Sequence, residues 1–184
     1  PDYFGKDFVL NDLTHDGGLT AIRIEGPTNS VDQRVKRLSK ELGLLDQELS
    51  ILDNEQSNIF WSRTKNLEVF KKLESNLLRI VLPISETLQV IQKLKSYDIK
   101  YFVDWGGSLI WAAFETLNTK ILSDIKDIVK KHQGYITLIK IEDDLKASAD
   151  IFTIDPIKYK ISEKIKRSFD PKRIFNPGKM YTGI

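Results

Sequence analysis

The sequence predicts an α+β protein with a mainly antiparallel sheet, helices on one face of it, and then a C-terminal helix and an extended tail. Two observations lead to this prediction. Residues 77–141 alternate strand-like runs with helical stripes in the order strand, helix, strand, strand, helix, strand, which is that of a split βαβ unit. One more helical stripe then stops against Pro171 and leads into a tail rich in turn residues.

Composition is that of an ordinary globular protein. Of its 184 residues, 41% are hydrophobic and 29% charged, with a net charge of +2, so neither disorder nor a fibrous repeat is indicated. The absence of cysteine excludes disulfides and fits a reducing cytosol. No apolar run approaches the ~18 residues of a membrane span, and the basic residues are spread along helical faces. We expect neither a transmembrane segment nor a nucleic-acid partner.

The first half predicts strand, helix, strand and helix. Residues 20–26 alternate apolar and polar side chains as a half-buried strand does, and residues 44–52 form a second strand-like run. Between them, a capping box at Ser30 and Gln33 opens a helix that ends at Gly43. A helix capped by Asp53 and Gln56 is expected to run to about residue 70.

The second half predicts the split βαβ unit. Strands are expected over 77–82, 100–104, 109–115 and 135–141, with a Trp-Gly-Gly-Ser turn between the middle two. Ser85 opens a helix with Leu88, Ile91, Leu94 and Tyr97 on its buried face, and residues 117–132 form a helix that buries Ile121, Ile125 and Ile128. The order is typical of a ferredoxin-like unit with helices on one face of the sheet.

Asp155 and Pro156 fit the N-cap and first position of the last helix. Its apolar stripe is Ile157, Ile161, Ile165 and Phe169. We expect Phe169 to pack on the core, and the tail beyond Pro171 to be held only loosely. The chain is interpreted as one compact domain over residues 1–184 with a trailing arm. It begins without Met, and we expect it to be an excised domain of a longer protein.

No arrangement of side chains predicts a metal site or a catalytic centre. The two histidines, His15 and His132, are far apart, and His132 fits a structural role at a helix C-terminus. The consecutive acids at 142–144 do not converge as an EF-hand loop would. The Trp105-Gly106-Gly107 turn is either a plain hairpin or a place where the backbone approaches a ligand or partner.

Several motifs occur in an order that resembles the FAD-binding accessory subunits of bacterial glycolate oxidase. They are TAIRIEGPTNSVD, FWSRTKN, LLRIVLP, DWGGSLIW, HQGYITLIKI, ADIF and FDPKRIFNPGKMY, and they cover roughly residues 20–181. The pattern FDPxxIFNPGKM also resembles the C-terminal signature of the wider family of FAD-linked oxidases related to vanillyl-alcohol oxidase.

This resemblance implies the C-terminal cap or substrate domain of an FAD-dependent 2-hydroxy-acid oxidoreductase, with the flavin domain N-terminal to this chain. The tail, residues 170–184, would return towards the flavin, with Asn176, Pro177 and Gly178 near the cofactor. The partners would be the other glycolate oxidase subunits, including a catalytic flavoprotein and an iron–sulfur subunit. The location would be cytoplasmic, or peripheral to the inner membrane through the complex.

Two observations limit what this chain does by itself. It has neither a Walker loop nor a G-x-G-x-x-G loop to cradle phosphates, and it lacks the G-H-x-G-[DE]-G-N-x-H stretch of the catalytic partner subunit. We therefore expect FAD to be bound by the full protein, and the isolated chain to be inactive. The alternatives are the cap of another flavin oxidase, acting on D-lactate or a sugar lactone, and a stand-alone ferredoxin-like ligand-binding module.

Overall fold

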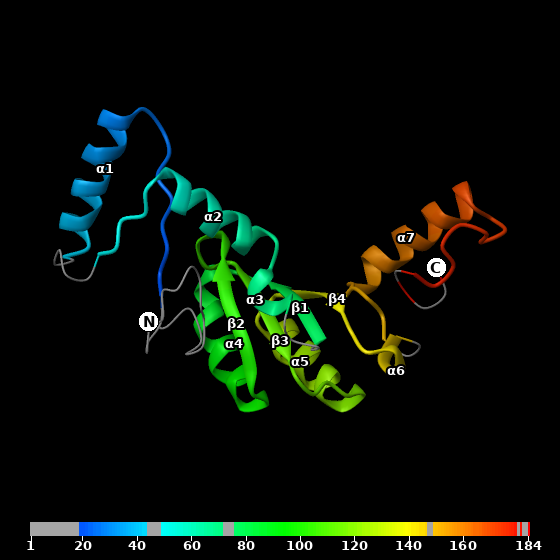
Figure 1. Ribbon diagram of the computed structural model, residues 1–184. Helices are drawn as coiled ribbons and strands as arrows, with labels where there is room; N and C mark the ends of the chain where they lie inside the picture. The colour runs from blue at the N-terminus through cyan, green and yellow to red at the C-terminus, as the bar shows by residue number, and fades with distance from the viewer. Residues whose placement is uncertain (1–18, 44–48, 72–75, 147–148, 180, 182–183) are drawn as a thin grey trace. The chain divides into compact units, whose positions relative to one another are not determined.

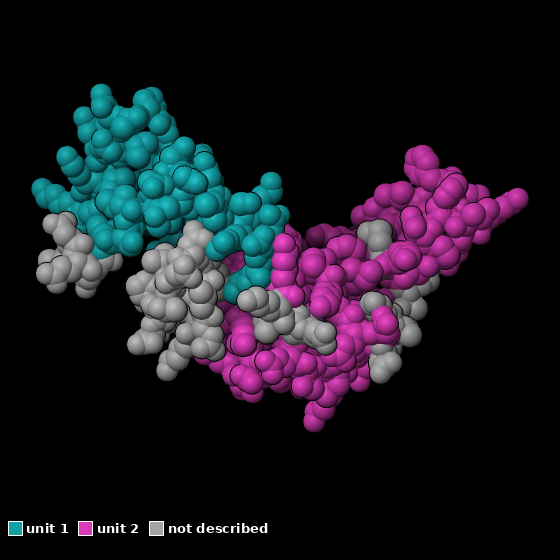
Figure 2. Space-filling model, viewed as in Figure 1, with its two compact units in different colours: residues 1–69 teal, residues 70–184 magenta. Residues whose placement is uncertain are grey.

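The structure is a computed structural model, and it describes residues 19–43, 49–71, 76–146, 149–179, 181 and 184. The chain divides into two compact units, residues 1–69 and residues 70–184, which Figure 2 colours separately. The second unit contains the sheet, the main core and the C-terminal helix (Figure 1). The mixture of helices with an antiparallel sheet confirms the α+β class.

Four strands form the sheet in the order β2-β3-β1-β4, and every neighbouring pair is antiparallel. They are β1 (Asn76–Val81), β2 (Ile99–Asp104), β3 (Leu109–Phe114) and β4 (Tyr135–Lys140). Helix α4 (Thr87–Leu94) connects β1 to β2, and α5 (Thr119–Lys131) connects β3 to β4. Strand β3 lies between β1 and β2, so these two run parallel with an antiparallel strand between them. The predicted sequence of elements is therefore the observed one.

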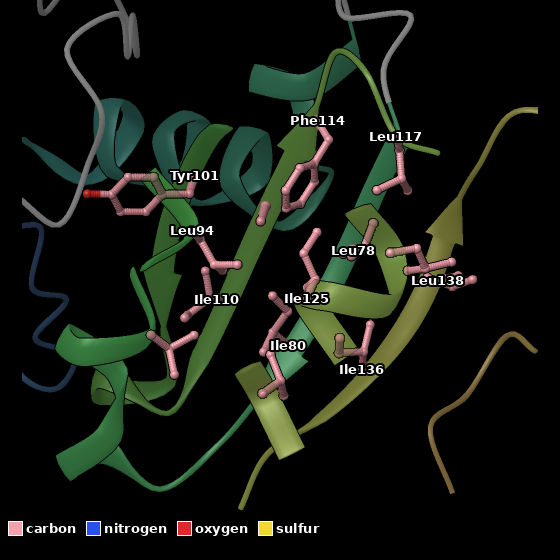
Figure 3. Close-up of a cluster of buried hydrophobic side chains, with 14 of the residues drawn as sticks. Leu78, Ile80, Leu94, Tyr101, Ile110, Phe114, Leu117, Ile125, Ile136 and Leu138 are labelled. Atoms are coloured by element: carbon pink, nitrogen blue, oxygen red, sulfur yellow. The ribbon is translucent and has the colours of Figure 1, made fainter. Parts of the chain in front are cut away.

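The core lies between one face of the sheet and helices α4 and α5 (Figure 3). Because side chains alternate along a strand, Leu78 and Ile80 of β1 enter this core while Arg79 points to the opposite face. The helices contribute Val90, Ile91 and Leu94 from α4 and Leu122, Ile125 and Val129 from α5. Full burial of each such side chain stabilises the fold by about 1.5–3 kcal/mol.

Helix α4 differs from the prediction at its start. A 3₁₀ turn, Ile84–Glu86, precedes it, so Ser85 does not open the α-helix. Leu88 is exposed, and Val90 occupies the buried face instead. The expectation for Leu88 is wrong because the buried stripe of α4 consists of Thr87, Val90, Ile91 and Leu94, and Leu88 is about 100° around the helix from Thr87.

Helix α5 ends in a turn that carries Lys130 and Lys131, and the chain then passes close to the sheet. His132 is its C-cap, and Gln133 takes the left-handed conformation with φ 57°. Gly134 serves packing, since a Cβ there would lie 2.7 Å from Val129 Cγ1 and 2.9 Å from the Val81 carbonyl oxygen. Of the predicted buried residues, Ile125 is fully buried, whereas Ile121 and Ile128 are partly buried against the core.

In the first unit, the structure corrects the prediction of strands. Residues 20–26 form no strand, and neither do residues 49–52; the rest of the second predicted strand, 44–48, lies outside the described residues. Helix α1 (Thr28–Glu41) begins two residues before Ser30, with Pro27 as N-cap and no side-chain cap, so the predicted capping box is wrong. A segment with an alternating pattern forms a β-strand only when it pairs with another strand. The described part of this unit contains no such partner.

Helix α2 (Asn54–Lys65) has the predicted capping box. The Asp53 carboxylate accepts a hydrogen bond from the Gln56 N–H at 2.8 Å, and the Gln56 side chain accepts one from the Asp53 N–H at 3.1 Å. The helix ends at Lys65 rather than near residue 70, because Leu67 takes a left-handed φ of 54°. A short helix, α3 (Glu68–Lys71), follows.

Helix α7 (Pro156–Phe169) follows the short helix α6 (Asp143–Lys146). Its start is as predicted, since the Asp155 carboxylate accepts hydrogen bonds from the N–H groups of Ile157 and Lys158 and Pro156 takes the first turn. The expectation that Phe169 packs on the core is wrong: its side chain is 85% exposed. The whole predicted stripe faces outward, and it consists of Ile157, Ile161, Ile165 and Phe169.

The tail is held more firmly than predicted. Tyr181 is only 8% exposed, and its ring centroid lies 6.0 Å from that of Phe152 and 6.1 Å from that of Tyr159 on α7. Phe152 forms an isolated antiparallel bridge with Thr137 on the outer edge of β4. The tail thus packs between α7 and the segment at the edge of the sheet. The polar side of the helix faces the tail.

We expect Tyr181→Ala to lower the free energy of unfolding by about 2–3 kcal/mol, because it empties an aromatic cluster. Phe169→Ala should change it by less than about 0.5 kcal/mol, because the ring is exposed. Urea denaturation of the two variants and the parent chain measures both values. Equal losses, or a larger loss at Phe169, would contradict this account of how the tail is held.

Candidate functional site

The face of the sheet opposite the core presents one continuous row of side chains. In register across the strands, Phe102 of β2 pairs with Trp111 of β3, Trp111 pairs with Arg79 of β1, and Arg79 pairs with Thr137 of β4. Directly opposite residues place their Cβ atoms about 4.5–5.5 Å apart on the same face. Phe102 is buried beneath the stacked ring of Phe70, whereas Trp111, Arg79 and Thr137 stay partly accessible. We call these last three, with Trp105, the Arg79 cluster.

Trp105 reaches the cluster from the hairpin turn between β2 and β3. The guanidinium carbon of Arg79 lies 4.8 Å from the centre of the Trp105 ring, which is a cation–π contact. The indole is nevertheless 59% exposed. Its backbone has a left-handed φ of 53°, a conformation that costs a non-glycine residue roughly 1–2 kcal/mol.

Several contacts hold the turn in that conformation. The Asp104 carboxylate accepts a hydrogen bond from the Trp105 N–H at 2.7 Å, and the hydroxyl of Thr87 donates to the Gly107 carbonyl oxygen. Gly107 has a φ of 113°, and a Cβ there would lie 2.7 Å from Ile84 Cγ1. A strained residue that is fixed from several sides is typical of a functional position. The close backbone approach at the Trp-Gly-Gly turn is to Ile84, in the 3₁₀ turn before α4.

In the part of the chain that the structure describes, the polar groups of Arg79 and Thr137 make no side-chain hydrogen bond or ion pair. Among the residues that the structure describes, no carboxylate forms an ion pair with Arg79, and its guanidinium donates no hydrogen bond. The hydroxyl of Thr137 likewise makes no hydrogen bond within the described part of the chain. Asp104, on the same face of β2, accepts the hydrogen bond from the Trp105 N–H through one of its two carboxylate oxygens. Within the described part of the chain, the side chains of Arg79 and Thr137 are therefore two neighbouring polar groups without a hydrogen-bond partner, and the Arg79 guanidinium lies against the exposed Trp105 ring.

The tail residues predicted to approach a flavin form an exposed turn. Asn176 and Gly178 are left-handed, with φ of 48° and 69°, and Pro177 lies between them. The turn is closed by hydrogen bonds from the Lys179 N–H to the Asn176 carbonyl and from the Gly178 N–H to the Ile184 carbonyl. The side-chain amide of Asn176 makes no hydrogen bond to any described residue, and the turn has no described contact with Arg79.

Asp170 fixes the start of this tail. Its carboxylate oxygens accept hydrogen bonds from the N–H groups of Ile174, at 3.0 Å, and Phe175, at 2.9 Å, and lie 2.9 Å from Lys166 Nζ. The hydrogen bond from Lys166, helped by the two backbone N–H groups and opposed by burial, lowers the pKa of Asp170 to about 2. The carboxylate is thus the anchor from which the exposed turn at Asn176 projects.

His132 occupies the structural position predicted for it. It is nearly buried at the end of α5, with Nδ1 2.5 Å from Glu86 Oε2 and Nε2 2.9 Å from Lys93 Nζ. These contacts join α4, α5 and the 3₁₀ turn before α4. His15 lies outside the described residues.

Sequence reasoning did not identify Arg79 or Thr137. The signal was present in the strand LLRIVL, where a charged residue stands in the middle of an otherwise apolar run. Such a residue must face away from the core or be paired within it. What the sequence alone does not provide is the register that aligns Arg79 with Trp111 and Thr137.

We expect the anchoring of the tail to depend on pH through Asp170. Because the pKa of Asp170 is lower in the folded chain than its ordinary value of 3.8, its contribution to stability is complete above about pH 4. That contribution is lost as the pH falls towards 2. Thermal unfolding of the parent chain and of Asp170→Asn between pH 6 and about pH 2 measures it. The gap between the two should close at the acid end; a gap that is constant over the range would contradict this role.

The residues that the structure describes offer no other evident site. Its described residues contain no group of three side chains suited to a metal ion, and none of the described helices has the length and apolar character needed to cross a bilayer. No protein-family model matches the chain, and no curated protein or solved structure matches it either.

Proposed function

We propose that this chain is the C-terminal domain of the FAD-binding subunit of a glycolate oxidase complex, where it supports the flavin-dependent oxidation of a 2-hydroxy acid. The ordered motifs from residue 20 to residue 181 support the choice of this family. The exposed surface of α7 supports a contact between this chain and a second domain. In FAD-linked oxidases of this type, the tail leaves the C-terminal domain and contacts the flavin domain.

The observation that carries the proposal is the exposed apolar stripe of α7. Four large side chains, spaced four residues apart, are more than half exposed, and Ile174 and Phe175 of the tail are exposed as well. Burying one such side chain fully is worth about 1.5–3 kcal/mol, so this stripe is a costly surface to leave in water. The opposite side of the helix is already used, since Tyr159, Glu163 and Lys166 contact the tail. A surface of this kind fits a second domain.

The residues present fit a limited contact with FAD. The tail turn projects an unpaired amide at Asn176 and two left-handed positions, which suits an approach to a flat ring edge. The sequence has no loop for the pyrophosphate. FAD would therefore be held mainly by the flavin domain, with Asn176, Pro177 and Gly178 as additional contacts.

When bound, FAD supplies the two-electron acceptor that oxidation of a 2-hydroxy acid requires. The part assigned to this chain is to cover the cofactor with its sheet face and tail, and so to exclude water and orient the substrate. The chain alone is expected to be colourless and inactive. The reading frame upstream of Pro1 tests the proposed function. A flavin-binding domain encoded there supports the proposal, and a start codon immediately before Pro1 contradicts it.

The contact of the α7 stripe with a second domain is tested with one substitution, made both in the chain alone and in the full-length protein. Ile161→Glu should leave the thermal midpoint of the chain alone unchanged, because Ile161 is exposed there. In the full-length protein it should destabilise the contact with the flavin domain by about 2–4 kcal/mol and lower the temperature at which flavin fluorescence appears. Lys160→Gln lowers the net charge of α7 by the same one unit outside the stripe and serves as the control. Equal behaviour of the two variants in the full-length protein argues against a domain contact at the stripe.

The tail contact is tested by Asn176→Ala in the full-length protein. We expect FAD content, or glycolate-dependent dye reduction, to fall by about three- to tenfold, the equivalent of one hydrogen bond. Asn66→Ala, at the exposed C-cap of α2, is the matched control. If Asn176→Ala lowers the stability of the isolated chain but leaves flavin content and activity normal, Asn176 serves only the local turn.

A further inference from the structure

We infer that the surface that covers the stripe of α7 in the full-length protein is acidic, with carboxylate groups opposite Lys158 and Lys164. The inference rests on the proposed function for the presence of a flavin domain over the stripe. It goes beyond that function because it states the chemistry of the partner surface, which the apolar side chains alone leave open.

Helix α7 carries more positive charge than its surroundings in this chain neutralise. Its 14 residues include five basic side chains and one acidic side chain. Two of the basic side chains form ion pairs, one with Asp170 and one with Glu163. The other three are exposed, and their ammonium groups have no ion-pair or hydrogen-bond partner among the residues that the structure describes; they are Lys158, Lys160 and Lys164.

Two of these three lysines border the apolar stripe. Because successive residues of an α-helix are about 100° apart, Lys158 and Lys164 lie about 60° to either side of Ile161. Lys160 lies about 100° from Ile161, outside the stripe. A partner that covers Ile161 therefore also covers the apolar stems of Lys158 and Lys164 and brings its own surface to their ammonium groups.

The helix itself disfavours both of these cations. Lys158 stands in the first turn, where the helix dipole is unfavourable to positive charge. The N-cap carboxylate of Asp155 accepts a hydrogen bond from the Lys158 N–H but forms no ion pair with its ammonium group. Lys164 stands one turn after Lys160, and like charges at this i,i+4 spacing destabilise a helix. An acidic partner surface relieves both unfavourable positions.

Exclusion of water from the contact adds to the need for an opposite charge. An ammonium group at the border of a buried apolar surface loses part of its hydration, and this costs free energy unless a carboxylate replaces the water. The acidic side chain of α7, Glu163, lies about 160° around the helix from Ile161. It pairs there with Arg167 and Arg173. The carboxylates must therefore come from the partner.

The first test compares three substitutions in the full-length protein, Lys158→Gln, Lys164→Gln and Lys160→Gln, each of which removes one positive charge from α7. The temperature at which flavin fluorescence appears reports the contact with the flavin domain. At low salt, Lys158→Gln and Lys164→Gln should each lower it by about 1–4 °C, as expected for the loss of one exposed ion pair. Lys160→Gln should leave it unchanged. At about 1 M NaCl the differences should vanish, because salt screens the charges.

The second test is carbodiimide cross-linking of the full-length protein, which joins a lysine amine only to a carboxylate in contact with it. Digestion and mass spectrometry should give peptides in which Lys158 or Lys164 is linked to an Asp or Glu of the flavin domain. Lys160 should give no such link. In the chain alone, none of the three substitutions should lower the thermal midpoint, because these ammonium groups have no described partner there.

Two results would overturn the inference while the proposed function stands. In one, Ile161→Glu loosens the flavin domain but the three lysine variants behave alike; in the other, Lys158 and Lys164 form no cross-link to that domain. If Ile161→Glu has no effect either, the contact itself is absent, and the proposed function fails at the stripe together with the inference. Binding to phosphatidylglycerol vesicles that is lost in Lys164→Gln but kept in Lys160→Gln would assign the lysines to a lipid surface and reject an acidic domain.

Discussion

The alternation of side chains along the central strand β1 is the constraint on which both the core and the Arg79 cluster depend. Leu78 and Ile80 enter the core, and Arg79 between them must face the other way. A slip of one residue would bury the guanidinium and expose both apolar side chains. Asn76 helps to prevent it: fully buried at the start of β1, it accepts a hydrogen bond from the Glu142 N–H and donates one to the Glu142 carboxylate.

The sequence was most informative where local chemistry decides the structure. The capping box at Asp53, the Asp155-Pro156 helix start and the order of elements in the second unit could all be predicted, since each depends on neighbouring residues or on a strong period. Residues 20–26 show the limit. Their alternation is that of a strand, but a strand also requires a partner at hydrogen-bonding distance, and a pattern contains no information about that.

The same limit explains the errors in burial. The stripe of α7 is a good amphipathic pattern, and the pattern implies that something covers it without specifying what. The prediction assigned it to the core of this chain; in the structure, the polar side of the helix is the one that packs inward, on the tail. The Arg79 cluster was missed for a related reason, because its members come from three strands and one turn and only the register of the sheet brings them together.

The segment that pairs with β4 has a consequence for solubility. The Leu138 N–H donates to the Ile151 carbonyl and the Thr153 N–H donates to the Ile136 carbonyl, so residues 151–153 occupy hydrogen-bonding groups that an outer strand would otherwise present to other molecules. Phe152, in the middle of this cover, is held by Tyr181. By holding Phe152, Tyr181 thus helps to keep the edge of β4 from pairing with a strand of another molecule. A chain cut short before Tyr181 would keep its core. Residues 151–153 would be held less firmly, and the edge of β4 would become more open to pairing with other molecules.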